Sequence, residues 1–235
     1  MAGRISYYGG IVKDGLVLDL DAAKRDSYVG VGTAWNDISG NGNNGTLING
    51  PTFNSGNGGY LVFNGSTQYY SLSTPPSSII NWYSGNYTLQ CWIYATAFAI
   101  SSNGGSPLCG NLTINTTTEY WSFGPINTGK VRMYFYSGVI NTFDSISTLS
   151  TNTWYYLTLS KVSNTISIYI NGVLDRSTTL SVTPQYSNSS PFTIAAGANN
   201  SKFNGRVSLL NIYNVGLSTS EVLQNYNATK GRFGL

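Results

Sequence analysis

The side chains that could carry out chemistry are few in this chain, and their types exclude most enzymatic mechanisms. The 235 residues include nine acidic ones and no histidine. Serine and cysteine nucleophiles normally need a histidine base, and glycoside hydrolysis needs two carboxyl groups that flank the scissile bond. Glu119 stands alone in the sequence, and Glu221 has the structural role described below. We therefore predict no catalytic residues and a protein that is not an enzyme.

Three aspartates could contribute to a metal site. Asp19, Asp21 and Asp37 supply carboxylates, and nearby asparagines and loop carbonyls could complete a calcium shell. In the alternative interpretation, Asp21 caps a short turn and Asp37 holds the loop Ser39–Gly45 through its backbone amides. We favour this alternative because too few acids cluster to require an ion. No metal or other cofactor is predicted, and a weak calcium site at these three residues is the competing hypothesis.

Cys91 and Cys109 are the only cysteines. Without histidine, two cysteines cannot form a standard zinc site. A single disulfide between them is one interpretation. We favour two reduced thiols, with Cys91 acting as a small buried hydrophobic residue in a strand.

Aromatic and basic side chains alternate with apolar ones in the predicted strand Val131–Tyr136. Val131, Met133 and Phe135 form its core face, so the residues between them share the opposite face. Such a face can stack on a sugar ring and donate hydrogen bonds to its hydroxyls. Packing under a loop and a subunit interface are the alternatives. The candidate carbohydrate-binding residues, which assume that strand 120–124 pairs with this one through the turn Pro125–Gly129, are Tyr120, Arg132, Tyr134 and Tyr136.

The composition indicates a neutral, polar surface over a large core. Hydrophobic residues make up 41% and charged residues 9%, and the net charge is +3. The basic residues never cluster beyond a pair, so we expect no nucleic-acid partner. No apolar run is long enough to span a membrane, and the first ten residues lack the apolar core of a signal peptide. We therefore expect no membrane partner and synthesis in the cytoplasm.

Strands dominate the predicted secondary structure. Asn-Gly pairs, which favour tight turns, occur at 64–65, 171–172 and 204–205. We therefore expect a turn at each pair, and the first turn is predicted to join a hairpin. Ser218 and Glu221 have capping-box spacing, with Leu217 and Val222 as a hydrophobic staple, and predict one helix near 218–228. The predicted strands are Leu16–Asp21, Tyr60–Phe63, Gln68–Leu72, Tyr87–Ala95, Tyr120–Gly124, Val131–Tyr136, Trp154–Val162, Thr165–Ile170, Phe192–Ala196 and Val207–Tyr213.

The chain shows no break in composition after its start. Residues 1–14 have little periodicity and are predicted to form an N-terminal arm or lead-in. Residues 15–235 are predicted to form one all-β domain, because a sandwich of this length is ordinary for a single domain.

Several segments together resemble a known family: GLVLDLDA at 15–22, WNDISGNGNNGTL at 35–47, LVFNG at 61–65, Trp154 with YING at 169–172, and the stretch 203–229. This set resembles the laminin G-like modules of the concanavalin A-like lectin/glucanase superfamily. More narrowly, it is similar to the versions in virion proteins of tailed phages, whose ending is similar to residues 225–233. The family's laminarinase-type Glu-x-Asp-x-x-Glu strand motif is missing here.

The resemblance implies a jelly-roll sandwich of two curved antiparallel sheets. It also implies a non-enzymatic protein of the phage virion surface, such as a capsid decoration, knob or fibre component, that presents a lectin-like module. The expected partners are capsid or tail proteins, further copies of the chain, and glycans. The alternatives are a carbohydrate-binding adhesin and an unusual glycan hydrolase, since one fold can host all three functions.

Overall fold

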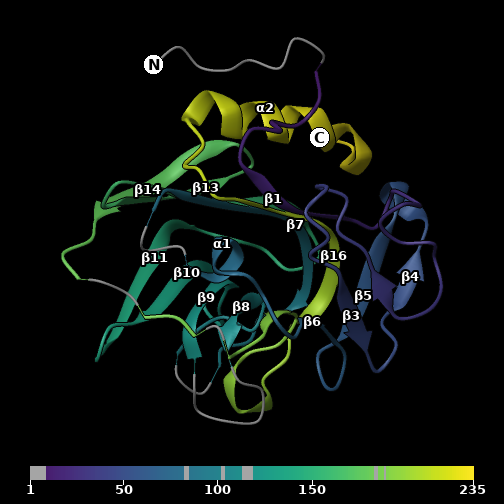
Figure 1. The fold of residues 1–235 in the computed structure, drawn as a ribbon, viewed down its shortest axis with the longest axis horizontal. Coiled ribbons are helices and arrows are strands. Elements are labelled where there is room, and N and C mark those ends of the chain that lie inside the picture. The colour runs from purple at the N-terminus through teal and green to yellow at the C-terminus, as the bar shows by residue number, and fades with distance from the viewer. Residues whose placement is uncertain (1–8, 82–84, 102–103, 113–118, 183–184, 188) are drawn as a thin grey trace.

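The computed structural model describes residues 9–81, 85–101, 104–112, 119–182, 185–187 and 189–235, and these form a two-layer antiparallel sandwich (Figure 1). The first sheet, sheet A, has the order β14-β13-β12-β7-β16-β5-β4, with β1 also paired to β16. Its strands are β1 (Leu16–Asp21), β4 (Thr52–Asn54), β5 (Tyr60–Asn64), β7 (Tyr87–Ala97), β12 (Trp154–Val162), β13 (Thr165–Ile170), β14 (Val173–Thr179) and β16 (Asn204–Tyr213).

The second sheet, sheet B, has the order β11-β10-β9-β8-β15-β6-β3-β2. Its strands are β2 (Ala34–Trp35), β3 (Gly45–Ile48), β6 (Tyr69–Leu72), β8 (Cys109–Leu112), β9 (Glu119–Pro125), β10 (Lys130–Tyr136), β11 (Ile140–Thr148) and β15 (Phe192–Ile194). The helices are α1 (Ser77–Ile80) and α2 (Thr219–Thr229), with 3-10 turns η1 (Gly56–Gly58), η2 (Ala198–Asn200) and η3 (Lys230–Phe233). The predicted β-sandwich with one short C-terminal helix is confirmed.

The core lies between the two sheets, because alternate side chains of each strand point to the same face. Val131, Met133 and Phe135 lie in this core, as predicted from their alternation. Cys91 from sheet A and Cys109 from sheet B are also buried there as free thiols, which confirms the predicted reduced state. Burial raises the pKa of both thiols, so they stay protonated.

The predicted hairpin at Asn64-Gly65 is wrong. β5 pairs with β4 and β16 in sheet A, whereas β6 pairs with β3 and β15 in sheet B. The Asn64 side chain accepts hydrogen bonds from the backbone N–H groups of three following residues and shapes the crossing between sheets. An alternating pattern shows which residues of a strand are buried, but it does not show which sheet the strand joins.

The predicted turn at Asn204-Gly205 is also wrong, because both residues belong to β16. The register of β16 against β7 shifts between them. A Cβ atom on Gly205 would lie 2.3 Å from the carbonyl oxygen of Tyr94. Glycine is therefore needed here for close approach of the two strands.

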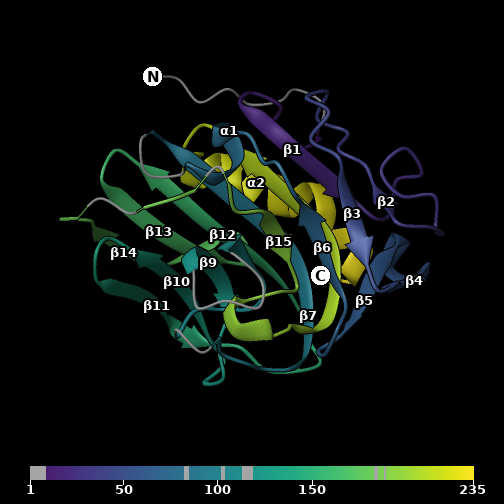
Figure 2. The same ribbon diagram turned by 60° about the horizontal axis from the view of Figure 1, so that its bottom comes forward.

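Helix α2 lies across the outer face of sheet A, as the yellow ribbon above β1 and β13 in Figure 1 shows. In Figure 2 the same helix lies behind the strands. The capping box of Ser218 and Glu221 is present, and Leu217 and Val222 are buried in one cluster, so both predictions are confirmed. None of the helices that the structure describes is long and apolar enough to cross a membrane.

Buried amides attach the helix and the chain start to sheet A. The Asn225 Nδ2 group donates to Gln90 Oε1 at 2.6 Å and to the Tyr213 hydroxyl at 2.9 Å. Asn225 Oδ1 accepts the backbone N–H of Val12 at 2.7 Å, and the Tyr213 hydroxyl donates to the Val12 carbonyl. The second half of the predicted arm, residues 9–14, is thereby held beside α2, while residues 1–8 lie outside the described residues. The division at residue 14 stays a prediction.

Replacing Ser218 by Ala removes the side-chain acceptor of the capping box, so we expect a loss of about 1 kcal/mol in the free energy of unfolding. Urea titration followed by circular dichroism measures this change. Ser55→Ala is the matched control, because Ser55 precedes η1 but makes no capping hydrogen bond. Equal stability of Ser218→Ala and the control would contradict the capping role.

Candidate functional site

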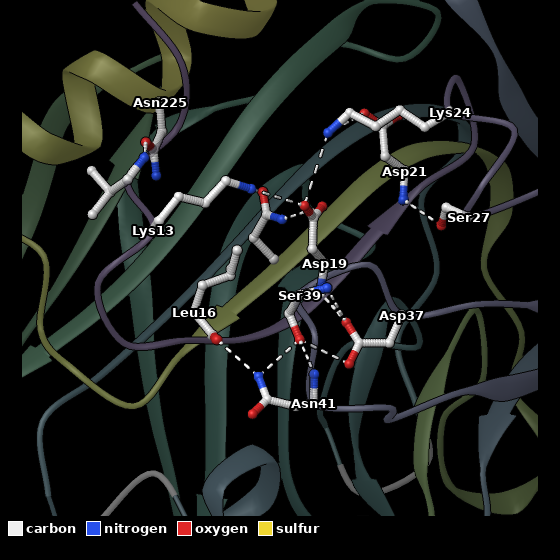
Figure 3. A network of polar contacts seen from close by, with 12 residues as sticks. Lys13, Leu16, Asp19, Asp21, Lys24, Ser27, Asp37, Ser39, Asn41 and Asn225 are labelled. Carbon is white, nitrogen blue, oxygen red and sulfur yellow. Dashed lines mark hydrogen bonds and ion pairs between the residues drawn. The ribbon is translucent and has the colours of Figure 1, made fainter. Parts of the chain in front are cut away.

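The three aspartates of the calcium hypothesis have different surroundings (Figure 3). Asp37 holds its loop, as favoured above. Its Oδ1 accepts the backbone N–H groups of Asp19 and Ser39 at 2.9 and 2.8 Å. Its Oδ2 accepts the Ser39 hydroxyl at 2.8 Å and the Asn43 N–H at 3.0 Å. The Asp37 carboxylate therefore organises the loop after β2.

Asp21 has three structural partners, and one of them is Lys24, whose Nζ lies 3.8 Å from Asp21 Oδ2. Its Oδ1 accepts the backbone N–H of Ala23 at 3.0 Å, which confirms the predicted turn cap. The Arg232 guanidinium donates to both Asp21 oxygens at 3.0 and 3.2 Å and also donates to the Ser208 hydroxyl. This charge-assisted pairing links the C-terminal turn η3 to the end of β1.

Asp19 is fully buried on the outer face of sheet A. Its Oδ1 accepts a hydrogen bond from Asn211 Nδ2 at 2.9 Å, and Lys13 Nζ and Lys24 Nζ lie 3.6 and 3.9 Å from its Oδ2. Burial raises the pKa of Asp19, and the two lysines oppose that shift. Among the described residues, no three Cys, Asp or Glu side chains gather to hold a metal ion. The three aspartates thus act through protein partners.

The predicted sugar-binding face is formed by the expected strands. β9 pairs with β10, and Ser122 lies opposite Tyr134. The Arg132 guanidinium, however, is bound by both oxygens of Asp144 at 2.6 Å and donates to the Gly104 carbonyl. Tyr134 is only 2% exposed.

The remaining two predicted residues differ in exposure. Tyr120 packs against the main core, whereas Tyr136 is 37% exposed. Neighbouring loops also cover this face: the Ser106 N–H donates to the Ser122 hydroxyl, and Asn111 Nδ2 donates to the Ser190 carbonyl. Sugar binding at Tyr120, Arg132, Tyr134 and Tyr136 stays a prediction. Tyr136 is the most exposed of these four residues.

A second aromatic surface lies on the outer face of sheet A, where the sequence analysis placed no site. We call Tyr60, Tyr94, Trp154 and Arg206 the aromatic–arginine patch. The Trp154 ring lies 5.5 Å from the rings of both Tyr60 and Tyr94, with interplanar angles of 66° and 59°. Tyr94, Trp154 and Arg206 are half-buried, so each keeps part of its surface in solvent.

Arg206 lies over the two tyrosines of the patch. Its guanidinium carbon is 4.2 Å from the Tyr94 ring centroid and 5.0 Å from that of Tyr60, both within cation–π range. Within the described residues, this guanidinium makes no side-chain hydrogen bond or ion pair. Its planar N–H donors are therefore free for a bound molecule, in contrast to those of Arg132.

Strand register brings the patch together. Trp154 of β12 lies opposite Tyr94 of β7, which in turn lies opposite Arg206 of β16. The C-terminal turn η3 packs beside these three residues, since the ring of Phe233 lies 4.6 Å from that of Trp154. The patch is thus built on rigid strands.

The patch escaped the sequence analysis because its members come from four strands far apart in the chain. The alternation of buried and outward-facing residues could have predicted one member of the patch. In the predicted strand Tyr87–Ala95, Ile93 and Ala95 point into the core, so Tyr94 between them points outward. Only the strand order places Trp154 and Arg206 beside it.

The sequence matches the model of an established family. A family model described as the concanavalin A-like lectin/glucanases superfamily, Laminin_G_3, matches residues 63–223. The chain therefore belongs to this superfamily, which confirms the broader part of the resemblance. In a comparison with curated proteins, none matches.

Solved structures show the same fold at low sequence identity. Domain 4 of AbnA, an extracellular arabinanase from Geobacillus stearothermophilus solved in complex with arabinotriose, has a TM-score of 0.66 and 18% identity, covering 90% of this chain and 98% of that one. The binding domain of Paraclostridial Mosquitocidal Protein 1 has a TM-score of 0.68 and 21% identity, covering 92% and 52%.

A third similar structure comes from botulinum neurotoxin type C, whose cell entry depends on interaction with two ganglioside molecules. Its TM-score is 0.68 at 14% identity, with coverage of 93% and 52%. The chain therefore spans about half the length of the two toxin structures. All three comparisons establish the lectin-like sandwich fold.

Replacing Asp19 by Asn tests its buried charge. Burial raises the pKa of Asp19 in the folded protein above its ordinary value of 3.8. The free energy of unfolding therefore falls as the pH rises from 3.8 through the folded-state pKa, because the buried carboxyl ionises over this range. We expect wild type to lose unfolding free energy relative to Asp19→Asn across that window and the difference to level off above it. Urea unfolding from pH 4 to 8 measures it.

Asp26→Asn is the control, because it removes the same charge from an exposed position. Its stability difference from wild type should not follow the Asp19→Asn curve. Parallel pH profiles for wild type and Asp19→Asn would contradict the assigned cost of ionisation.

Proposed function

We propose that this chain is a non-catalytic, glycan-binding module of a virion surface protein. The observation that carries the binding role is the aromatic–arginine patch, in which the half-buried Trp154 indole, the half-buried Tyr94 phenol and an unused guanidinium meet on one outer sheet face, with Tyr60 buried beside them. Sugar rings present C–H groups on their faces and hydroxyls on their edges. Aromatic faces contact the former, and arginine N–H groups bind the latter.

The comparisons support a binding role for this fold. The AbnA domain was solved with an arabinose oligosaccharide, and the neurotoxin depends on gangliosides, which are also glycan-bearing molecules. We extend glycan binding to this chain because it presents a surface of suitable chemistry. The patch spans neighbouring strands of sheet A, so it suits contact with more than one part of a glycan.

The absence of catalysis is supported by how the acidic side chains are used. Glycoside hydrolysis needs two carboxyl groups available to the substrate. Six of the nine acidic residues instead hold groups of the protein itself: Asp19, Asp21, Asp37, Asp144, Asp175 and Glu221. Release of reducing sugar from a bound polysaccharide would overturn this part of the proposal.

Display on a virion is supported by the resemblance of residues 225–233 and the preceding segments to phage virion modules. Capsid or tail proteins would anchor the module in many copies, and multivalent display strengthens weak individual contacts. Detection of the protein on purified particles tests this placement. Its absence from particles would leave a free-standing adhesin as the alternative.

Replacing Trp154 or Arg206 by Ala should weaken glycan binding about tenfold each, since a lost aromatic or charge-assisted contact costs on the order of 1.4 kcal/mol. A glycan array identifies a ligand, and calorimetry with that ligand measures the affinity of each variant. Circular dichroism and urea unfolding confirm that the variants remain folded.

Tyr136→Ala is the matched control, because it removes an exposed aromatic from the other candidate surface. It should bind like wild type. If Tyr136→Ala loses affinity while Trp154→Ala keeps it, binding takes place at β10 and the patch assignment fails. An array without any bound glycan would contradict the binding role as a whole.

A further inference from the structure

Arg206 is the charged member of the aromatic–arginine patch, and no carboxylate compensates its charge. The four strands that carry the patch, β5, β7, β12 and β16, contain no aspartate or glutamate. Within the part of the chain that the structure describes, the Arg206 guanidinium takes part in no ion pair. Arg132, by contrast, is paired with Asp144. The patch therefore presents one positive charge without a counter-ion.

Stacking holds Arg206 in place and leaves its N–H groups unused. The guanidinium carbon lies 4.2 Å from the Tyr94 ring centroid and 5.0 Å from that of Tyr60. These contacts use the ring faces, whereas the five N–H donors of a guanidinium lie in its own plane. Because Arg206 is half-buried, part of its side chain stays open to solvent and to a ligand.

A guanidinium without a counter-ion favours an oxyanion over a neutral hydroxyl. Its planar fork can donate to two oxygens of one carboxylate or sulfate, and such charge-assisted hydrogen bonds are about twice as strong as neutral ones. The tyrosine rings beside Arg206 increase the difference, because electrostatic attraction is stronger in partly desolvated surroundings than in bulk water. An acidic substituent therefore gains more from Arg206 than a hydroxyl does.

The acidic group and the stacked ring would come from neighbouring parts of one glycan. Trp154 of β12 and Arg206 of β16 lie on either side of Tyr94 of β7 in the strand register. Adjacent strands are about 4.8 Å apart, so two strand spacings separate the two backbones by roughly 10 Å. A sugar ring on the Trp154 face can thus be followed by an acidic group at Arg206.

We propose that the aromatic–arginine patch selects anionic glycans, with a carboxylate or sulfate accepting hydrogen bonds from the Arg206 guanidinium and an adjoining sugar ring stacked on Trp154. The inference rests on the proposed function and narrows its ligand class from glycans in general to glycans that carry an acidic group. Carboxylates and sulfates share this chemistry, so the test contains one pair of probes for each.

The test compares acidic glycans with neutral forms of the same sugars. The probe pairs are trigalacturonate with its methyl ester, and lactose sulfated on its galactose ring with plain lactose. Calorimetry of the full chain should show at least tenfold tighter binding of the acidic member in at least one pair. Raising the NaCl concentration from about 0.1 M to about 1 M should remove most of this preference, because the screening length falls from ~10 Å to ~3 Å.

Two substitutions separate the charge from the ring surface. Arg206→Gln keeps a hydrogen-bond donor but removes the charge, so it should bind the acidic and neutral members about equally. Trp154→Ala removes the stacking surface, so it should weaken binding of both members by a similar factor and keep the preference for the acid. Circular dichroism and urea unfolding confirm that both variants remain folded.

Arg25→Gln is the matched control, because it removes a positive charge from an exposed position outside the patch. It should keep the wild-type preference, whereas a loss equal to that of Arg206→Gln would indicate attraction by net charge alone and overturn the inference. Equal affinity of wild type for both members of both pairs, or no binding of either acid, also overturns it. A neutral array ligand that depends on Trp154 would then leave the proposed function standing.

Discussion

The packing of the C-terminal segment on the outer face of sheet A is the interaction on which the other features depend. The Phe233 ring stacks 4.1 Å from that of Trp92 and packs 4.6 Å from that of Trp154. The indole N–H of Trp92 donates to the Thr229 hydroxyl at 2.8 Å, so this buried polar group is satisfied. The same segment covers apolar strands, supports the patch and supplies Arg232 to the Asp21 carboxylate at the end of β1. Closure of the fold and support of the aromatic–arginine patch therefore use one set of contacts.

The two arginine-bearing faces differ in whether their donors are already used. Arg132 forms a two-point ion pair with Asp144, so its guanidinium stabilises sheet B and has little capacity for a ligand. Arg206 only stacks on tyrosine rings and keeps its donors free. Stacking holds the guanidinium in place at small cost, because aromatic faces do not compete for N–H groups. A fixed but unsaturated group of this kind suits recognition better than one in a closed ion pair.

Local features of the structure could be predicted from the sequence, and long-range ones could not. The capping box at Ser218 and the core alternation of Val131–Tyr136 involve neighbours in the chain, so spacing alone reveals them. The sheet crossing after Asn64 and the close strand approach at Gly205 depend on partners more than a hundred residues away. For the same reason the patch was missed, since Tyr94 and Arg206 meet only through the strand order. The Tyr/Arg pattern of β10 was visible locally, but its ion pair to Asp144 was not.

The most direct test of glycan binding on sheet A is nuclear magnetic resonance of the side-chain N–H groups during titration with a glycan selected from the array. Trp35, Trp92 and Trp121 are fully buried, whereas Trp154 is half-buried, so its indole signal can report on the patch. We expect the Trp154 Nε1–H and Arg206 Nε–H signals to shift in proportion to bound ligand, while the Arg132 Nε–H signal stays in place. Shifts at Arg132 with an unchanged Trp154 signal would contradict binding at the aromatic–arginine patch.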